Sequence, residues 1–392
     1  MMRNYRNQVG KLGVLLSLLL LATAQACQPT PEAVYIGAVD NTGTKLAIEL
    51  AVEQINTAGG INGAELRVIF ASAPQGQSIA HQAVAIADEL ATDPRIVAVV
   101  GHENSTESLP AAHVYNRNGV VNIVPGSSNP LITDVGPWIF RLSINDELHG
   151  KFLADVAIEK LQFDDIAVLF TNNDYGKMLV NAFMNQFRQK GGQISYVAFF
   201  EVNDTGIVAR ISEQIIDADI RQIFFIGTIP DITAMLRRFD EADFTATVLS
   251  SDTTFSVNWS GPIAATRGKS RVFSSTFYNP LLQSTANINF MEAFSKKYGR
   301  EPEPNDALFY DSVNLLAEAI KNSGATRESV REYIVGVGTK TQPFEGASGT
   351  ISFTHGGNNR RPVSILEHGD VLSVFESRVI PDAQSSEPAS DR

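Results

Sequence analysis

Short apolar runs that each end in a polar turn occur along this sequence, and two of them constrain the fold most. The first, Ile96–Gly101, precedes residues 102–106 (His-Glu-Asn-Ser-Thr), and the second, Val120–Val124, precedes residues 125–130 (Pro-Gly-Ser-Ser-Asn-Pro). Runs of this kind are typical of buried strands in a parallel sheet covered on both faces. Because such sheets bind ligands at the carboxyl ends of their strands, hydroxyls and backbone N–H groups there suit a small anion such as a carboxylate.

Strand and helix patterns alternate along most of the chain, which predicts parallel sheets with right-handed crossovers. The alternation begins with a strand at Val34–Val39 and a helix at Lys45–Asn56, and it restarts after about Ser143. Two sets of strands and helices, with helices left over for the first set, predict an α/β protein with two lobes and a chain that crosses between them repeatedly. A small ligand is expected between two such sheets.

The N-terminus predicts export. A basic segment, an apolar segment at Leu12–Ala22 and small residues up to Ala26 together indicate a signal peptide over residues 1–26. Cys27, the single cysteine, follows directly, and we expect it to be lipidated and to anchor residues 27–32 as a tether; simple cleavage after Ala26 is the alternative. The protein is then periplasmic or on the cell surface. Residues 379–392 have the composition of a disordered tail.

Composition excludes several other classes of protein. The chain has 392 residues, 44% of them hydrophobic, and a net charge of −12, which argues against a nucleic-acid surface. Its histidines lack metal-ligand spacing, so no metal or cofactor is expected. The glycine-rich segment 336–340 lacks the full spacing of a phosphate loop, and no G-x-S-x-G elbow or nucleophile–base pair is present, which disfavours a hydrolase.

Several motifs resemble a known family in their order. They are 59–63 (Gly-Gly-Ile-Asn-Gly), the two polar turns at 101–106 and 125–130, 173–176 (Asn-Asp-Tyr-Gly), 250–252 (Ser-Ser-Asp) and 309–312 (Phe-Tyr-Asp-Ser). Over residues 33–375 the chain resembles the leucine/isoleucine/valine-binding type (type I) of periplasmic solute-binding proteins of ABC transporters. The resemblance implies a non-enzymatic flytrap of two Rossmann-like lobes with mainly parallel sheets, joined by three crossovers near Leu142–Asp146, Phe273–Phe277 and Gly349–Phe353. Lobe 1 is then 33–143 with 277–350, and lobe 2 is 144–276 with 351–378.

The resemblance also implies how a ligand is held. Ser105, Gly126 and Ser128 of lobe 1 match positions that bind the α-carboxylate of an amino acid, and Asp252 of lobe 2 matches the partner of its α-ammonium. Tyr175 matches an aromatic wall residue, and Thr228 stands where a ligand-contacting aromatic is usual. Charge-assisted bonds of this kind replace the solvation of a buried zwitterion. Splitting them between lobes couples ligand binding to closure.

One departure from the family concerns ligand identity. After Asp40, residues 41–44 (Asn-Thr-Gly-Thr) pass directly into a helix, where the family has a longer loop that covers the ligand. The pocket is therefore expected to differ from that of leucine-binding members. We predict capture of an amino acid, branched-chain ones included, or of a related small polar solute, with ABC permease subunits as partners. A sensor or cell-envelope regulator of the same fold is the alternative.

Overall fold

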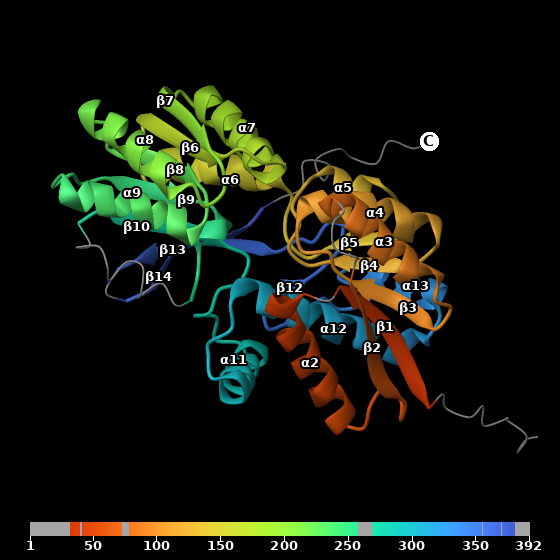
Figure 1. Cartoon of the computed structure of the whole chain (residues 1–392). Coiled ribbons are helices and arrows are strands. Elements are labelled where there is room, and N and C mark those ends of the chain that lie inside the picture. The colour runs from red at the N-terminus through yellow and green to blue at the C-terminus, as the bar shows by residue number, and fades with distance from the viewer. Residues whose placement is uncertain are drawn as a thin grey trace, which may run out of the picture.

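The structure is a computed structural model, and it describes residues 32–39, 41–72, 78–257, 269–354, 356–369 and 371–380. The chain forms two α/β lobes, each built on a mainly parallel sheet (Figure 1). This confirms the fold class that the sequence predicts. Cys27 and the signal peptide lie outside the described residues.

Lobe 1 contains a five-stranded parallel sheet in the order β2-β1-β3-β4-β5. Helices cover both of its faces, which explains why the strands have apolar residues at nearly every position. The strands are β1 (Ala33–Val39), β2 (Glu65–Ala71), β3 (Ile96–Val100), β4 (Val121–Val124) and β5 (Ile139–Arg141). The helices are α2 (Thr42–Thr57), α3 (Ile79–Thr92), α4 (Ser105–Arg117), α5 (Leu131–Asp134), α11 (Thr285–Tyr298), α12 (Pro304–Ser323) and α13 (Arg327–Gly336).

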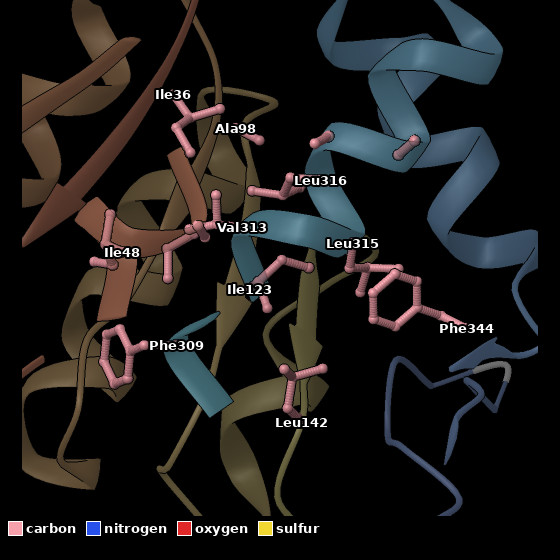
Figure 2. Packing of buried hydrophobic residues seen from close by; sticks show 14 of the residues in the cluster. Ile36, Ile48, Ala98, Ile123, Leu142, Phe309, Val313, Leu315, Leu316 and Phe344 are labelled. Atoms are coloured by element: carbon pink, nitrogen blue, oxygen red, sulfur yellow. The ribbon is translucent and has the colours of Figure 1, made fainter. Parts of the chain in front are cut away.

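Two apolar cores flank this sheet. One joins the sheet to α2, α11, α12 and α13, and the other joins it to α3, α4 and α5. Figure 2 shows the first core, in which Val313 and Leu316 of α12 lie toward Ile36 and Ile123 of the strands. Helix α12 comes from a part of the chain far from these strands, so lobe 1 is completed only after the chain has built most of lobe 2.

Lobe 2 contains a seven-stranded sheet in the order β14-β13-β10-β9-β8-β6-β7, in which β13 runs antiparallel to both of its neighbours, β10 and β14. Its strands are β6 (Asp165–Thr171), β7 (Gln193–Phe200), β8 (Gln222–Ile226), β9 (Thr247–Ser250), β10 (Arg271–Thr276), β13 (Pro362–His368) and β14 (Ser373–Val379). Helices α6 (Asp146–Glu159) and α7 (Asp174–Gln189) pack on one face. Helices α8 (Thr205–Asp217) and α9 (Ile229–Glu241) pack on the other.

In the described part, the chain passes between the lobes after β5, after β10, and between β12 and β13. A short antiparallel pair, β11 (Phe344–Gly346) and β12 (Gly349–Ile351), precedes the third passage. Buried Arg361 connects all three passages, because its guanidinium donates to the carbonyl oxygens of Leu142, at 3.2 Å, of Ser348, at 2.6 Å, and of Phe277.

Several boundaries differ from those that the sequence predicts. Helix α2 begins at Thr42 rather than Lys45, because the Asn41 side chain caps it by accepting from the Gly43 N–H. Similarly, the sequence pattern predicts a helix at Lys151–Lys160, whereas α6 begins at Asp146, because the Asn145 side chain caps it there. The tail predicted from residue 379 starts too early, since Val379 is the last residue of β14; residues 381–392 lie outside the described part. The apolar pattern missed α5 and β5, which are too short to show a period.

Candidate functional site

The two polar turns of lobe 1 lie side by side. They follow the paired strands β3 and β4. The Ser105 hydroxyl accepts from the Asn129 N–H at 3.3 Å, and the Ser127 hydroxyl donates to the Glu103 carbonyl at 2.9 Å. Ser105 is the first residue of α4, and the cap position is Asn104, so Ser105 is not the helix cap.

Gly126 lies where these turns meet the start of α12. A Cβ at this position would be 3.3 Å from both the Asn305 side-chain oxygen and the Glu103 carbonyl, so only a glycine fits without movement. Glu103 is fixed by the amides of Asn305 and Asn41, both at 2.6 Å. Burial raises the pKa of Glu103, and those two amides act against the rise. No sequence pattern indicates that Glu103 joins three elements.

The second turn continues along the first passage between the lobes. The N–H groups of Leu142, Ser143 and Asp146 donate to the carbonyls of Val124, Pro125 and Ser128, the last at 2.8 Å. Ser128 is buried. The turn that carries Ser128 is therefore joined by backbone hydrogen bonds to the start of α6 in lobe 2.

Tyr175 and Asp252 come together in lobe 2, at the carboxyl ends of β6 and β9. The Tyr175 hydroxyl donates to the Asp252 carboxylate at 2.5 Å, and 22% of the Asp252 side chain is exposed. Gly176 allows the start of α7 to approach β6 closely, because a Cβ there would be 2.1 Å from the Thr171 carbonyl. This close approach positions Tyr175 for its bond to Asp252.

Two residues that the sequence analysis did not assign also reach this place, both from α6. The buried imidazole of His149 lies with Nδ1 3.8 Å from the Asp252 carboxylate and Nε2 2.9 Å from the Ser275 hydroxyl. Asp146 is fully buried, next to the turn of Ser128. Their only sequence signal was a cluster of polar residues at a helix start, which is also the usual composition of a helix cap.

The charges of these groups influence one another. Burial and the Asp252 carboxylate raise the pKa of Asp146 to about 7, against the effects of the Ser128 hydroxyl and the Arg141 guanidinium. Burial lowers the pKa of His149, although Asp252 acts in the opposite direction. Burial, Asp252 and Asp146 raise the pKa of Tyr175, which stays a hydrogen-bond donor. The site is therefore rich in acceptors for a cation.

Thr228 has a local structural role. It caps α9, and its hydroxyl lies 2.7 Å from the Asp231 carboxylate and 2.8 Å from the Asn203 side-chain oxygen. No hydrogen bond among the described residues joins it to Tyr175 or Asp252. The segments that carry Thr228 and Asp252 are nevertheless adjacent, since the hydroxyl of Thr253, which follows Asp252, donates to the carbonyl of Gly227, which precedes Thr228, at 2.7 Å.

Other sequence candidates have structural roles. Residues 336–340 follow the end of α13, where the N–H groups of Lys340 and Thr341 donate to the Gly336 carbonyl and so are not directed at a phosphate. Within the described ranges, no group of three or more His, Cys, Asp or Glu side chains is placed to hold a metal ion. No helix in those ranges is long and apolar enough to cross a membrane.

Comparisons with known proteins agree with this architecture. A family model described as periplasmic binding protein matches residues 36–368. The chain is 26% identical over 338 residues to a Leu/Ile/Val-binding protein homolog from Brucella abortus, with 86% of each chain covered. It is 28% identical over 313 residues to a leucine-, isoleucine-, valine-, threonine- and alanine-binding protein from Pseudomonas aeruginosa, covering 79% of this chain and 80% of the relative.

Solved structures show the same two lobes. An ABC transporter substrate-binding protein from Desulfitobacterium hafniense in complex with leucine is 26% identical, with a TM-score of 0.71, and the match covers 88% of this chain and all of that one. A benzoate-bound protein from Rhodopseudomonas palustris, 15% identical with a TM-score of 0.76 over 90% of this chain and 98% of its own, shares the fold. With the family model matching most of its length, the chain belongs to the periplasmic binding proteins, in the group that includes the Leu/Ile/Val-binding proteins.

Proposed function

We propose that the protein captures an amino acid, a branched-chain one first of all, between its two lobes and delivers it to an ABC importer. The observation that carries this proposal is the Tyr175–Asp252 pair at 2.5 Å, which presents a partly exposed carboxylate in lobe 2. The hydroxyl- and N–H-rich turns of lobe 1 supply the opposite kind of partner. The relatives named for leucine, isoleucine and valine support the choice of ligand.

Each lobe then takes one end of the ligand. Ser105, Ser128 and the Gly126 N–H bind the α-carboxylate from lobe 1. Asp252 accepts from the α-ammonium, and Tyr175 orients Asp252 and lines the site. Thr228 contributes its methyl group near the ligand side chain, because its hydroxyl is engaged by Asp231.

Binding and closure are linked by this division. A ligand that moves the protein from mostly open to almost wholly closed needs about 5 kcal/mol of preference for the closed form. Hydrogen bonds to charged groups contribute about 1.5–3 kcal/mol each, so two or three that form only on closure are sufficient.

Calorimetric titration tests the ligand assignment. We expect leucine, isoleucine or valine to bind, and Asp252→Asn to weaken leucine binding by about 30- to 100-fold, because a charged hydrogen bond is lost. Asp174→Asn is the matched control, since this exposed acid is next to Tyr175 and leaves Asp252 unchanged. Unchanged leucine binding by Asp252→Asn would overturn the ammonium assignment. A wild-type protein that binds no α-amino ligand would overturn the proposed function.

We also propose that Cys27 is lipidated and holds the mature protein at a membrane, facing the permease. The signal segment that precedes this single cysteine supports the proposal. Labelled palmitate should be incorporated by the wild-type protein in a bacterial host and not by Cys27→Ser. Equal labelling of both, or of neither, contradicts the anchor.

A further inference from the structure

Asp146 is a buried carboxylate without a visible structural task. It is fully buried, and among the described residues neither carboxylate oxygen has a partner at ordinary hydrogen-bond geometry, although the nearby Ser128 hydroxyl lowers its pKa. It does not cap its helix, because the Asn145 side chain accepts from the Leu148 N–H at 2.9 Å and so performs that role. Burying an unpartnered carboxylate is costly, so a residue of this kind needs another explanation.

The surroundings of Asp146 show what such a carboxylate could bind. The charged and titratable groups that act on it are Asp252 beyond β9 and Arg141 of β5, and its charge reaches Tyr175 of α7 in turn. His149, one turn further along α6, also has an unpartnered ring nitrogen, Nδ1, on the side of Asp252. Two carboxylates whose charges act on each other repel, and a cation between them stabilises both.

An ammonium group matches this arrangement. It has three N–H donors and no acceptor, so it can donate to more than one carboxylate at once. Tyr175 occupies one oxygen of Asp252, which leaves the other oxygen of Asp252 and both oxygens of Asp146 as acceptors.

We propose that Asp146 is a second carboxylate of the ammonium site, acting from the first passage while Asp252 acts from lobe 2, and that this pair limits the site to ligands with a protonated amine. The inference rests on the proposed function and specifies its ligand class. Carboxylic acids without an amine, such as the benzoate held by a protein of the same fold, are excluded by repulsion from the two acids.

The burial of Asp146 predicts that the protein releases a proton when it binds its ligand. Its pKa is raised to about 7, so below pH 7 the carboxyl group is mostly protonated before the ligand binds. An ammonium group that needs the charged form displaces this proton. Affinity should therefore rise as the pH increases from 6 to 8, by up to about tenfold for each pH unit below the pKa.

The experiment titrates leucine, leucine amide and 4-methylpentanoate into the wild-type protein and Asp146→Asn. The amide keeps the ammonium group without a carboxylate, and 4-methylpentanoate keeps the carboxylate without an amine. Calorimetry at pH 6.5, in buffers of different ionisation enthalpy, counts released protons. Glu147→Gln is the matched control, because Glu147 is an exposed acid in the same first turn of α6, paired with Lys151.

We expect Asp146→Asn to weaken binding of leucine and of leucine amide by about 10- to 100-fold and to abolish proton release, with Glu147→Gln unchanged. The wild-type protein should not bind 4-methylpentanoate. Wild-type leucine binding without proton release overturns the inference even if Asp146→Asn does not fold. Leucine binding that depends on Asp252 and not on Asp146 overturns this inference alone. Absence of binding by every amine overturns the proposed function with it.

Discussion

Replacing Arg361 by Met should destabilise the whole protein, because this side chain connects the three passages between the lobes. Its guanidinium is fully buried and donates to the carbonyls of Leu142, Ser348 and Phe277. Met has a similar length and no donor. The substitution therefore removes the hydrogen bonds without leaving a large cavity.

The loss of stability in Arg361→Met can be estimated from the carbonyls that are left without a donor. The Leu142 carbonyl keeps the Asn359 amide at 2.9 Å, whereas the Ser348 and Phe277 carbonyls lose a charged donor. Each buried acceptor that loses its partner costs about 1–3 kcal/mol. The buried Asp311 carboxylate also loses a positive charge that lowers its pKa. Together these losses give about 3–5 kcal/mol, in the range for breaking a buried charged network.

Urea unfolding followed by circular dichroism measures this loss. Arg360→Met is the matched control, since the neighbouring Arg360 side chain is exposed and should change the free energy of unfolding by less than about 0.5 kcal/mol. In an Asp311→Asn background, Arg361→Met should cost less, because one of its partners is already neutral. If Arg361→Met and Arg360→Met have equal midpoints and slopes, the connection through Arg361 does not stabilise the protein.

Two further predictions concern stability. Burial lowers the pKa of His102 to about 4, so the folded protein favours the neutral imidazole, and the free energy of unfolding falls as the pH drops below about 6.5. Urea unfolding near pH 5 should therefore show that His102→Gln loses less stability on acidification than the wild type, by about 1.4 kcal/mol per pH unit. Parallel curves of stability against pH for the two proteins would contradict this. Gly176→Ala places a Cβ 2.1 Å from the Thr171 carbonyl, so it should lower the free energy of unfolding by about 1–3 kcal/mol and weaken leucine binding through Tyr175. Gly206→Ala is the control, because its Cβ meets only Asp204 at 3.7 Å and the substitution should be neutral or slightly stabilising. Equal melting temperatures for the two variants would refute this prediction.

The sequence predicted the two lobes because the apolar runs of parallel strands are continuous and each is bounded by turn residues. Val121–Val124, for example, is buried at every position, and the apolar residues Ala47, Leu50 and Ala51 of α2 are buried. The antiparallel strand β14 was missed because its residues are mostly exposed or half-buried and give no continuous apolar run. A local pattern also cannot show that α12 packs against strands more than 200 positions earlier.

The site was predictable only where a strand end carries its own signal. The turns of Ser105 and Ser128 each follow a predicted strand, and the structure places them side by side. Asp146 and His149 could not be singled out, because each depends on where α6 sits relative to β9 and β10. A polar residue at a helix start is usually a cap, and only the third dimension shows that Asn145 already performs that role.

The first passage between the lobes links the hydrogen bonds of Arg361 to the proposed ligand site. The Leu142 carbonyl accepts a hydrogen bond from the Arg361 guanidinium, and four residues later the Asp146 N–H donates to the carbonyl of Ser128. The segment that joins the lobes thus runs along the turn proposed to hold the ligand carboxylate and ends at the proposed second acid of the ammonium site. A ligand that bonds to Ser128, Asp146 and Asp252 would therefore act on both sides of this passage. Its binding energy could bias the angle between the lobes through a few backbone hydrogen bonds, without a long chain of intermediate contacts.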